Sequence, residues 1–329
     1  MTLQDVAKAA KVSRSTASEA LAGTGRMTAA TRQSVVEAAQ RLGYRPNAVA
    51  RSLRTGRMRA IGLHYLSSGD RFASPYFREF TTGVLDVTQP EDYDLTLLSS
   101  NPEVPRQALP RVDGVIIADP IADDLRAHAL IGSALPIVAG ELYPPGMPSS
   151  PVVSADHATA LRAILDHAHG HGATRPALIA PGPNSGWGVL LRRTFEEWCA
   201  ERGLPGTTRE SRFGDTDPVA HTRLAAALFA AEPDTDLLVV SSEVAAIAAL
   251  GVVRDRGRHP GVDVLLACCA DGPRLDVTEP SITAIDMRPR TLGRECARML
   301  IDLLEGRGAP QEDKLVPAEV VFRASTGAR

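Results

Sequence analysis

Several features that mark whole classes of protein are scarce or absent in this chain of 329 residues. Its four cysteines are too few for a disulfide scaffold, and two of them, Cys268 and Cys269, adjoin in an apolar run. We therefore expect buried, unpaired thiols in a reducing compartment. The opening residues, MTLQDVAKAA, have no apolar core, and no run approaches the roughly 18 uncharged apolar residues of a membrane span. We expect neither a secretory signal nor a transmembrane helix.

Catalytic signatures are also missing. The chain has no G-x-S-x-G nucleophile motif and no phosphate-binding P-loop, and Gly23-Thr24-Gly25 lacks the preceding strand of a dinucleotide loop. The composition, with 44% hydrophobic and 23% charged residues, is close to that of globular proteins. It therefore excludes a wholly disordered chain. The length fits two or three modules of about 100–200 residues each.

The net charge of −3 hides an uneven distribution. Residues 1–59 hold eleven lysines and arginines against three acids, a net of +8, which leaves −11 for the rest. A compact basic head on an acidic body is typical of a nucleic-acid-binding module joined to another domain. A solvated basic surface without a partner is the plainer alternative.

The head has the pattern of three short helices. Thr2, Ser13 and Thr28 are candidate N-caps, and Asp5 completes a capping box with Thr2. Apolar residues then recur at helical spacing on each segment, and glycines end the second and third. Two short helices joined by a tight turn and braced by a third predict a helix-turn-helix. The second helix presents polar side chains, as a recognition helix needs.

The head resembles the DNA-binding domain of LacI/GalR-type transcriptional regulators. The matching pieces are LQDVAKAAKVS, the S-T-A-S core of the second helix, TRQSVVEAAQRLGYRPN and ARSLRTG, in order and without gaps. The resemblance implies that residues 1–45 form a helix-turn-helix domain and residues 46–59 a hinge helix and linker.

The resemblance also implies DNA contacts at matching positions. Arg14, Ser15 and Glu19 would face major-groove bases, and Thr2, Thr16, Ser18 and Asn47 would contact phosphates. Leu53 matches the leucine that wedges into the minor groove, flanked by Ala50, Arg51 and Arg54. The alternative for Leu53 is packing within its own domain.

Two head positions depart from the family. Glu19 stands where an arginine is usual, and Ala22 replaces an asparagine. A glutamate cannot bind guanine O6 and N7 but can accept from cytosine N4, or it can point at solvent. We expect an operator half-site that differs from the common one.

After Arg59, apolar strands alternate with helical patterns, which predicts parallel sheets covered by helices on both faces. We place strands at 61–66, 95–98, 112–118, 136–140, 177–180, 237–240, 263–269 and 282–285. We place helices at 75–88, 122–133, 157–169, 187–201, 218–231, 243–256 and 290–305.

This body is similar to the periplasmic-binding-protein-like core of the same family. Matching pieces include RVDGVIIA, PIVAG, VSADHATALRAILDHA, VSSEVAAIAALGVVRDRG and LVPAEVVFRAST. The likeness implies two Rossmann-like lobes over residues 60–329. The N-lobe would hold about 60–152 and 287–316, and the C-lobe about 153–285 and 317–329, with three crossings between them.

Polar and aromatic side chains that follow predicted strands are our effector-binding candidates, because ligands of open α/β sheets bind beyond the C-terminal strand ends. They are Ser67, Phe72, Tyr76, Asp119, Glu141, Asn184, Trp187, Glu243 and Asp271. Asp271 is the strongest candidate, since it matches one acid of an Asp-Asp pair at the family's ligand site. Each could equally be an ordinary polar loop residue.

The body departs from the family in ways that point to an atypical effector. The first acid of the pair is Ala270, and the usual sugar-binding arginine aligns with Leu191. The usual Asn-Asp is Ser242-Glu243, and NPEVPRQALP is too short and proline-rich for the helix normally found there.

Two other constellations carry less weight. His167, His169 and His171 alternate near a helix end, where metal binding is one reading and imidazoles that favour the helix dipole the other. Acids of the body could act as a glycosidase pair, but nothing fixes their separation.

We therefore expect a cytoplasmic DNA-binding transcriptional regulator, a repressor, and neither an enzyme nor a cofactor or metal protein. It would act as a homodimer on a pseudo-palindromic double-stranded operator, with DNA affinity modulated by a sugar-like or atypical small-molecule effector. The sequence has no C-terminal heptad repeat, so we do not expect a coiled-coil tetramer. The alternative is a sugar-binding protein or carbohydrate enzyme with a vestigial head, which should not retain a charge of +8.

Overall fold

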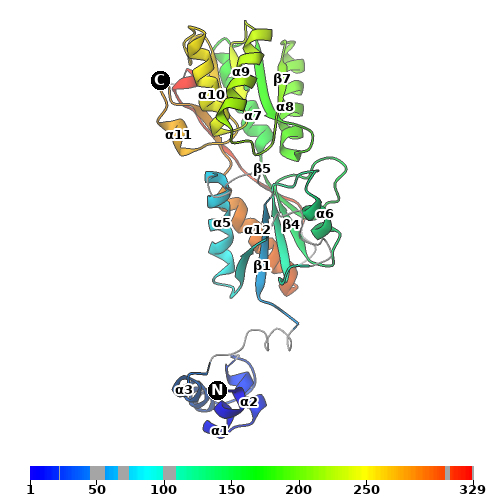
Figure 1. The fold of residues 1–329 in the computed structure, drawn as a ribbon, viewed down its shortest axis with the longest axis vertical. Coiled ribbons are helices and arrows are strands. Elements are labelled where there is room, and N and C mark those ends of the chain that lie inside the picture. Colours follow the sequence, from blue (N-terminus) through cyan, green and yellow to red (C-terminus); the bar gives the residue numbers. More distant parts are fainter. Residues whose placement is uncertain (22, 45–55, 66–73, 99–108, 308–311, 328–329) are drawn as a thin grey trace. The chain divides into compact units, whose positions relative to one another are not determined.

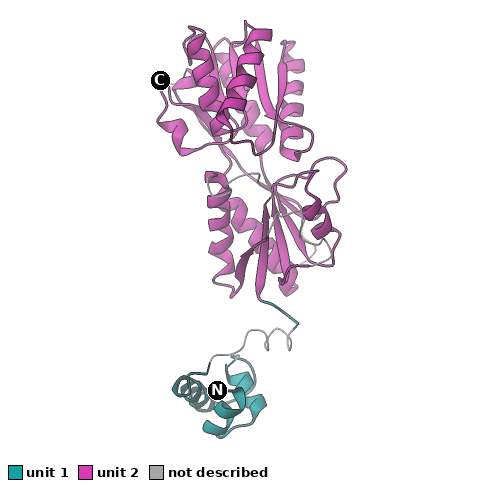
Figure 2. Cartoon of the chain, viewed as in Figure 1, with its two compact units in different colours: residues 1–58 teal, residues 59–329 magenta. Residues whose placement is uncertain are grey.

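The computed structural model describes residues 1–21, 23–44, 56–65, 74–98, 109–307 and 312–327. The chain separates into two compact units, Met1–Met58 and Arg59–Arg329, coloured differently in Figure 2. The expected fold class is confirmed: helices form the first unit, and two α/β lobes with parallel sheets form the second.

The first unit contains helices α1 (Leu3–Ala9), α2 (Arg14–Leu21) and α3 (Ala29–Arg41). Thr2 and Asp5 form the expected capping box on α1, and the Thr28 hydroxyl accepts from the Thr31 amide at the start of α3. The Ser13 hydroxyl accepts from the Thr16 amide at 3.0 Å. Each cap satisfies an amide that the first helical turn leaves without a partner.

The three helices bury one small core. It is built from valines and alanines, with longer side chains packed at its edge; its buried members are Val6, Ala7, Ala17, Ala20, Val35, Ala38 and Ala39. These residues recur at three- and four-residue spacing, so each helix turns one apolar stripe inward. The opposite stripe of α2 is thereby left free to face a partner.

The second unit contains two six-stranded sheets. The first has the order β11-β5-β4-β3-β1-β2 and is parallel throughout. The second has the order β12-β10-β9-β8-β6-β7 and is parallel except for β12, which runs against β10. The strands are β1 (Ala60–Tyr65), β2 (Asp94–Leu97), β3 (Gly114–Ala118), β4 (Ile137–Gly140), β5 (Val152–Ala155), β6 (Pro176–Pro181), β7 (Thr207–Ser211), β8 (Leu237–Val240), β9 (Leu265–Cys268), β10 (Thr283–Asp286), β11 (Lys314–Val316) and β12 (Glu319–Val321).

Helices cover both faces of each sheet (Figure 1). The first lobe carries α5 (Pro75–Thr88) and α12 (Pro289–Glu305) on one face and α6 (Leu125–Ile131) on the other. The second carries α7 (His157–Gly170) and α8 (Gly186–Arg202) against α9 (Pro218–Ala231) and α10 (Glu243–Asp255), with α11 (Pro273–Asp276) and a short 3-10 turn (Ala324–Thr326) beyond its strands.

Strand β6 illustrates the double burial. Leu178 and Ala180 join the core under α7 and α8, while Ala177 and Ile179 join the core under α9 and α10. Because successive side chains of a strand point to opposite faces, a strand covered on both sides reads as a continuous apolar run.

The chain passes between the lobes three times: after β5, between β10 and α12, and between β11 and β12. Residues 153–155, which the sequence boundary assigned to the C-lobe, pair with β4 and β11 in the first sheet. The parallel strands of both sheets point their C-terminal ends toward the junction of the two lobes, where a ligand site of this architecture belongs.

Eight strands and seven helices of the body lie where the sequence pattern places them. Four strands were missed: β5, which was taken as a crossing, and β7, β11 and β12. The last three are partly exposed, so they lack the apolar run on which the expectation was based. Most of the proline-rich segment NPEVPRQALP lies outside the described residues.

Candidate functional site

The exposed stripe of α2 carries the side chains expected to read DNA. Arg14, Ser15 and Glu19 are exposed, and Thr16 and Ser18 are half-buried. Ala17 and Ala20 anchor the opposite stripe in the core, which fixes the direction in which the polar stripe faces. Short polar side chains and one arginine on an exposed helix face suit both base edges and phosphates.

Hydroxyl groups cluster where α2 begins. The Ser13 hydroxyl lies 2.7 Å from that of Ser15 and 2.8 Å from that of Thr16. A helix N-terminus with free amide dipoles and hydroxyls attracts anionic oxygen, such as that of a phosphate. Thr2, also expected at a phosphate, is exposed, and its hydroxyl is shared with the Asp5 capping box.

Glu19 lies against the turn that follows α2. A Cβ atom at Gly25 would come within 2.4 Å of its carboxylate, so the glycine makes room for the acid. Arg32 of α3 donates to the Thr24 carbonyl at 3.3 Å and steadies the same turn. Because Glu19 is exposed, its reach toward a base remains a prediction.

Several expected site residues lie outside the described part of the chain. In the hinge these are Asn47, Ala50, Arg51, Leu53 and Arg54, and in the body they are Ser67 and Phe72.

A cavity of about 140 Å³ lies between the two lobes of the second unit. Its lining comes largely from the C-terminal ends of strands in both sheets: Tyr65, Asp119, Glu141, Pro181, Ser241 and Ala270. Liquid water takes about 30 Å³ per molecule, so the cavity has room for a small organic ligand.

Asp119 and Glu141 follow neighbouring strands, line this cavity and have positive φ angles. Asp119 follows β3 with φ of 52°, and Glu141 follows β4 with φ of 88°. Left-handed backbone is costly for residues with a Cβ and gathers at functional sites. Here the Asp119 amide donates to the Gly140 carbonyl at 2.7 Å and the Glu141 amide to the Val153 carbonyl at 2.9 Å, which continues the sheet while turning both acids into the cavity.

Glu141 is held by a buried relay of side chains. The indole N–H of Trp187 donates to Nδ1 of His157 at 3.1 Å, and Nε2 of His157 lies 2.8 Å from Oε2 of Glu141. An indole nitrogen only donates, so Nδ1 accepts and the imidazole proton sits on Nε2, directed at the carboxylate. This relay fixes His157 as a neutral imidazole, because a proton on Nδ1 would face the indole N–H.

The side chains of Asp119 and Tyr76, unlike that of Glu141, have no hydrogen-bond partner among the described residues. Burial, and then the charge of Glu141, raise the pKa of the Asp119 carboxyl well above its usual value. Burial, followed by the charges of Asp119 and Glu141, also raises the pKa of Tyr76. The Tyr76 hydroxyl is buried and finds no hydrogen-bond partner among the described residues. Unpaired buried polar groups are costly, and a ligand would satisfy them.

The structure brings four effector candidates together in the cavity, Tyr76, Asp119, Glu141 and Trp187. Asn184 lies instead at a contact between the lobes, where its amide donates to Asp123 at 3.3 Å.

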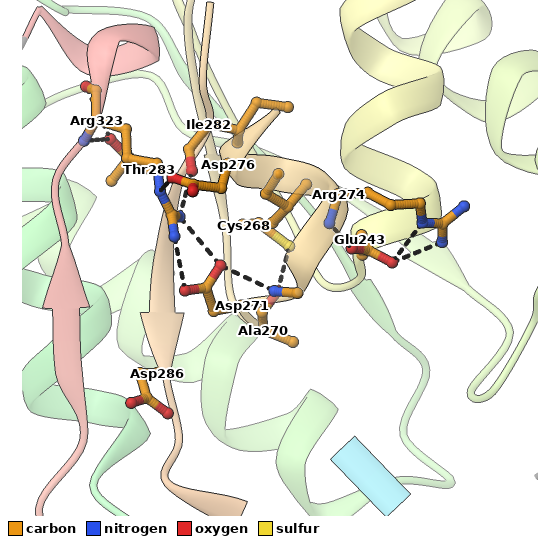
Figure 3. A network of polar contacts seen from close by, with 12 residues as sticks. Glu243, Cys268, Ala270, Asp271, Arg274, Asp276, Ile282, Thr283, Asp286 and Arg323 are labelled. Atoms are coloured by element: carbon orange, nitrogen blue, oxygen red, sulfur yellow. Dashed lines mark hydrogen bonds and ion pairs between the residues drawn. The ribbon is translucent and has the colours of Figure 1, made fainter. Parts of the chain in front are cut away.

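Asp271 and Glu243 are occupied by arginines, as Figure 3 shows. Arg323 donates to both oxygens of Asp271, at 3.0 and 2.9 Å, and Asp271 lines a second, larger cavity rather than the first. Arg274 pairs with Glu243 at 2.6 Å, and its backbone amide also donates to that carboxylate. The strongest candidate from the sequence is thus engaged in an ion pair.

Other cavity residues escaped the sequence interpretation. The loop Arg212–Asp215 and His221 line the cavity, and Phe213 packs edge-on against Trp187 with ring centroids 6.5 Å apart. This loop follows β7, which was not recognised, so its residues could not be placed at a strand end. His157 follows β5 in the same way.

The histidines at the C-terminal end of α7 form hydrogen bonds with main-chain carbonyl oxygens. His167 contacts the Thr326 carbonyl at 3.0 Å, His169 that of Ala173 at 2.9 Å, and His171 that of His167 at 2.8 Å. The described residues contain no group of three or more side chains that could hold a metal ion. They also contain no helix long and apolar enough to cross a membrane.

All four cysteines are buried and unpaired, as expected. Burial raises the pKa of Cys199 to about 11 and that of Cys268 to about 12, which keeps both thiols protonated at neutral pH.

Two family models match the chain. Residues 2–47 match the model of bacterial regulatory proteins of the lacI family, and residues 165–326 match a periplasmic binding protein-like domain.

Curated relatives match over nearly the whole length. The HTH-type transcriptional regulator CelR of Thermobifida fusca is 28% identical, with 98% of each chain covered. The regulator AglR of Rhizobium meliloti (strain 1021) is 29% identical, covering 99% of this chain and 94% of the relative. The ribose operon repressor of Bacillus subtilis (strain 168) is 26% identical, covering 99% and 98%.

Solved structures share the fold. A lac repressor dimer bound to operator and the anti-inducer ONPF aligns with a TM-score of 0.83 at 22% identity, covering 100% of this chain and 99% of that one. A complex of the regulator CelR with cellobiose aligns with a TM-score of 0.74 at 24% identity, covering 99% of each chain.

Proposed function

The chain belongs to the LacI family of transcriptional regulators, and we propose that it is a repressor whose hold on an operator is set by a small molecule in the interlobe cavity. It is a DNA-binding regulator and not an enzyme. We place its activity in the cytoplasm, where the operator is.

The observation that carries the DNA-binding proposal is the exposed polar stripe of α2 on a basic head. Arg14 and Ser15 are exposed at the start of this helix, where they would meet base edges, and the hydroxyls of Thr16 and Ser18 lie beside them and would contact phosphates. The surplus of eight positive charges in residues 1–59 supplies the sequence-independent attraction to DNA.

A homodimer follows from the small size of this surface. One helix reads few bases, and a two-fold dimer doubles the contacts on a pseudo-palindrome with half-sites about one helical turn apart. Leu53, with Ala50, Arg51 and Arg54 beside it, would enter the minor groove at the centre of the site. Among relatives, the lac repressor is seen as a dimer on its operator.

The cavity supports the effector proposal. A small ligand there would touch both lobes and so favour one arrangement of them over another, which is what a coupled site must do. CelR is seen with cellobiose, so a sugar-like ligand is one chemical starting point. The unpaired Tyr76 hydroxyl and Asp119 carboxyl support a polar ligand for this cavity.

Selection of bound duplexes from a random DNA pool, at fixed salt, tests the proposal. We expect a palindrome with a central pyrimidine–purine step, and loss of this enrichment in Leu53→Ala. Uniform weak binding of all sequences by the unaltered chain at low salt would overturn the proposal.

Arg14→Ala sharpens the test. It should cost about 1–3 kcal/mol and relax the sequence preference at one position in each half-site. Arg41→Ala is the matched control, because it removes the same charge from the exposed end of α3. If both variants lose affinity equally on all sequences, α2 does not read bases.

A further inference from the structure

The polar lining of the interlobe cavity is unbalanced in charge. Three carboxyl groups line it, those of Asp119, Glu141 and Asp215, while Arg212 is the one lysine or arginine among the described lining residues. Arg212 is exposed at the rim, whereas Glu141 is almost completely buried. A buried carboxylate without a cation is unfavourable, so the described lining favours a ligand that brings positive charge into the cavity.

Two other acids near the junction of the lobes form ion pairs with arginines of the chain. Asp271 is paired with Arg323 through both oxygens, and Glu243 is paired with Arg274 (Figure 3). Neither of these paired acids lines the cavity. The acids at the cavity are thus the ones to which the described residues supply no guanidinium or ammonium group.

The histidine beside Glu141 does not supply the missing positive charge. The Trp187 indole holds His157 as a neutral imidazole, so it donates a hydrogen bond to Glu141 without adding charge. Asp119 has no hydrogen bond or ion pair from its carboxyl group to any described residue.

Aromatic rings complete the cavity. Tyr65, Tyr76, Trp187 and Phe213 all line it, and Trp187 and Phe213 meet edge-on. Aromatic faces attract cations as well as the C–H faces of sugar rings. Rings around two acids to which the described residues supply no cation favour a ligand that is both cationic and compact.

We propose that the effector of this cavity carries a protonated primary amine on a small polar body, such as an amino sugar, with Asp119 and Glu141 as the groups that receive the amine. This inference rests on the proposed function, because it names the chemical class of the proposed effector. The ammonium group donates to both carboxylates, and the hydroxyls of the ligand satisfy the Tyr76 hydroxyl. An ammonium ion favours the ionised form of Asp119, so ligand binding should lower the pKa of this carboxyl and release protons from it.

Matched ligands provide the test. The full-length protein is heated at pH 6 with glucosamine, galactosamine and mannosamine, each against its neutral hydroxyl parent and its N-acetyl derivative. We expect at least one amine to raise Tm by several degrees, with its neutral counterparts ineffective. Stabilisation by the neutral sugars to the same degree, or by none of the amines, overturns the inference.

Asp119→Asn locates the effect. It should lower affinity for the stabilising amine at least tenfold in calorimetric titration. Asp94→Asn is the matched control, because Asp94 is an exposed acid at the opposite end of the first sheet. Unchanged amine affinity in Asp119→Asn, or an equal loss in Asp94→Asn, contradicts the assignment.

Proton release gives an independent readout. Calorimetry of the amine in two buffers of different ionisation enthalpy should show proton release on binding at pH 6, and none in Asp119→Asn. The other titratable or charged groups that line the cavity are Tyr65, Tyr76, Glu141, His157, Arg212, Asp215 and His221. Proton release that persists without Asp119 assigns the proton to one of these and overturns the role of Asp119.

The selection of bound DNA distinguishes failure of the DNA-binding proposal from failure of the amine effector. If a palindromic operator is enriched while no amine stabilises the protein, the regulator stands and the amine effector fails. If an amine binds but no operator is enriched, the DNA-binding proposal fails and the cavity assignment stands.

Discussion

The carboxylate of Asp271 is held at both oxygens by Arg323, a residue 52 positions later in the chain. The guanidinium also donates to the Ile282 carbonyl at 2.7 Å and lies 3.3 Å from Asp276. Its side chain is 12% exposed and that of Asp271 is 22% exposed, so water screens this pair only weakly. The contact joins the end of β9 to the C-terminal segment, which gives Asp271 a structural task.

Asp271→Asn should therefore destabilise the protein without affecting ligand binding. We expect a loss of about 1–3 kcal/mol in the free energy of unfolding, because a mostly buried guanidinium loses its main partner. Urea denaturation measures the loss, and calorimetry with a ligand of the wild-type protein measures binding.

Asp276→Asn is the control for this pair. Asp276 also contacts Arg323 but is 73% exposed, so its removal should cost no more than about 1 kcal/mol. A tenfold loss of ligand affinity in Asp271→Asn at unchanged stability would return Asp271 to the binding site.

Helices α5 and α12 pack against each other through glycines. A Cβ at Gly83 would lie 2.0 Å from the Arg290 carbonyl oxygen, and one at Gly293 would lie 2.1 Å from that of Phe80. Neither helix tolerates a side chain there, so the two backbones approach closely. At the edge of this contact Asp86 of α5 accepts from Arg290 at 2.8 and 3.0 Å and from Arg294 at 2.8 Å.

This ion pair predicts a pH dependence. The hydrogen bonds from Arg290 and Arg294 lower the pKa of Asp86 to about 2, from 3.8. The unfolded chain therefore binds a proton at Asp86 more readily than the folded protein does, so the stabilisation is complete above pH 4 and is lost as the pH falls toward 2.

Asp86→Asn should flatten the fall in unfolding free energy between pH 4 and pH 2, as urea titrations at a series of pH values would show. Asp94→Asn, at an exposed acid of β2, serves as the comparison and should keep the wild-type slope. The same slope in Asp86→Asn and the wild type would contradict the assignment.

Elements with local signals were predictable from the sequence. Helices α5 and α9 begin and end at the expected residues, because Ser74 and Asp217 cap them and a proline follows each cap. Strands β7, β11 and β12 lie at or next to sheet edges with exposed residues, so they carry no apolar run. The glycine contact of α5 with α12 depends on pairing two helices far apart in sequence, which no local pattern encodes.

In the candidate site too, some residues were predictable from local sequence and others depend on tertiary contacts. The strand-end rule found Asp119 and Glu141, because both directly follow buried apolar strands. It also selected Asp271, although Arg323 holds that acid outside the cavity. Whether a strand-end acid faces a ligand or a counter-ion depends on tertiary contacts, and the strand pattern does not contain them.

At the scale of the whole second unit, the two lobes meet through main-chain contacts beside the cavity. Ile121 and Ser185 form an isolated antiparallel bridge, in which the Ala122 amide donates to the Asn184 carbonyl at 2.9 Å. A Cβ at Gly186 would lie 2.3 Å from the carbonyl oxygen of Leu142. This interlobe contact therefore requires glycine at the first residue of α8.

Gly186→Ala should break the interlobe contact while leaving each lobe folded. The added methyl group cannot fit against the Leu142 carbonyl, and backbone on both sides leaves nothing flexible to give way. The Ala122 amide should then exchange with solvent faster, measured by hydrogen–deuterium exchange, while amides within β3 and β4 keep their protection. Gly251→Ala, in α10 with open space around it, is the matched control.

The consequence for regulation follows from linkage. An effector that favours the lobe arrangement with this contact formed can change operator affinity only by its preference for that arrangement, typically 5- to 150-fold. If Gly186→Ala removes this arrangement of the lobes, the factor should fall toward one, while operator affinity without effector persists. Full coupling in a variant whose Ala122 amide has lost its protection would show that the signal reaches the head by a route other than this contact.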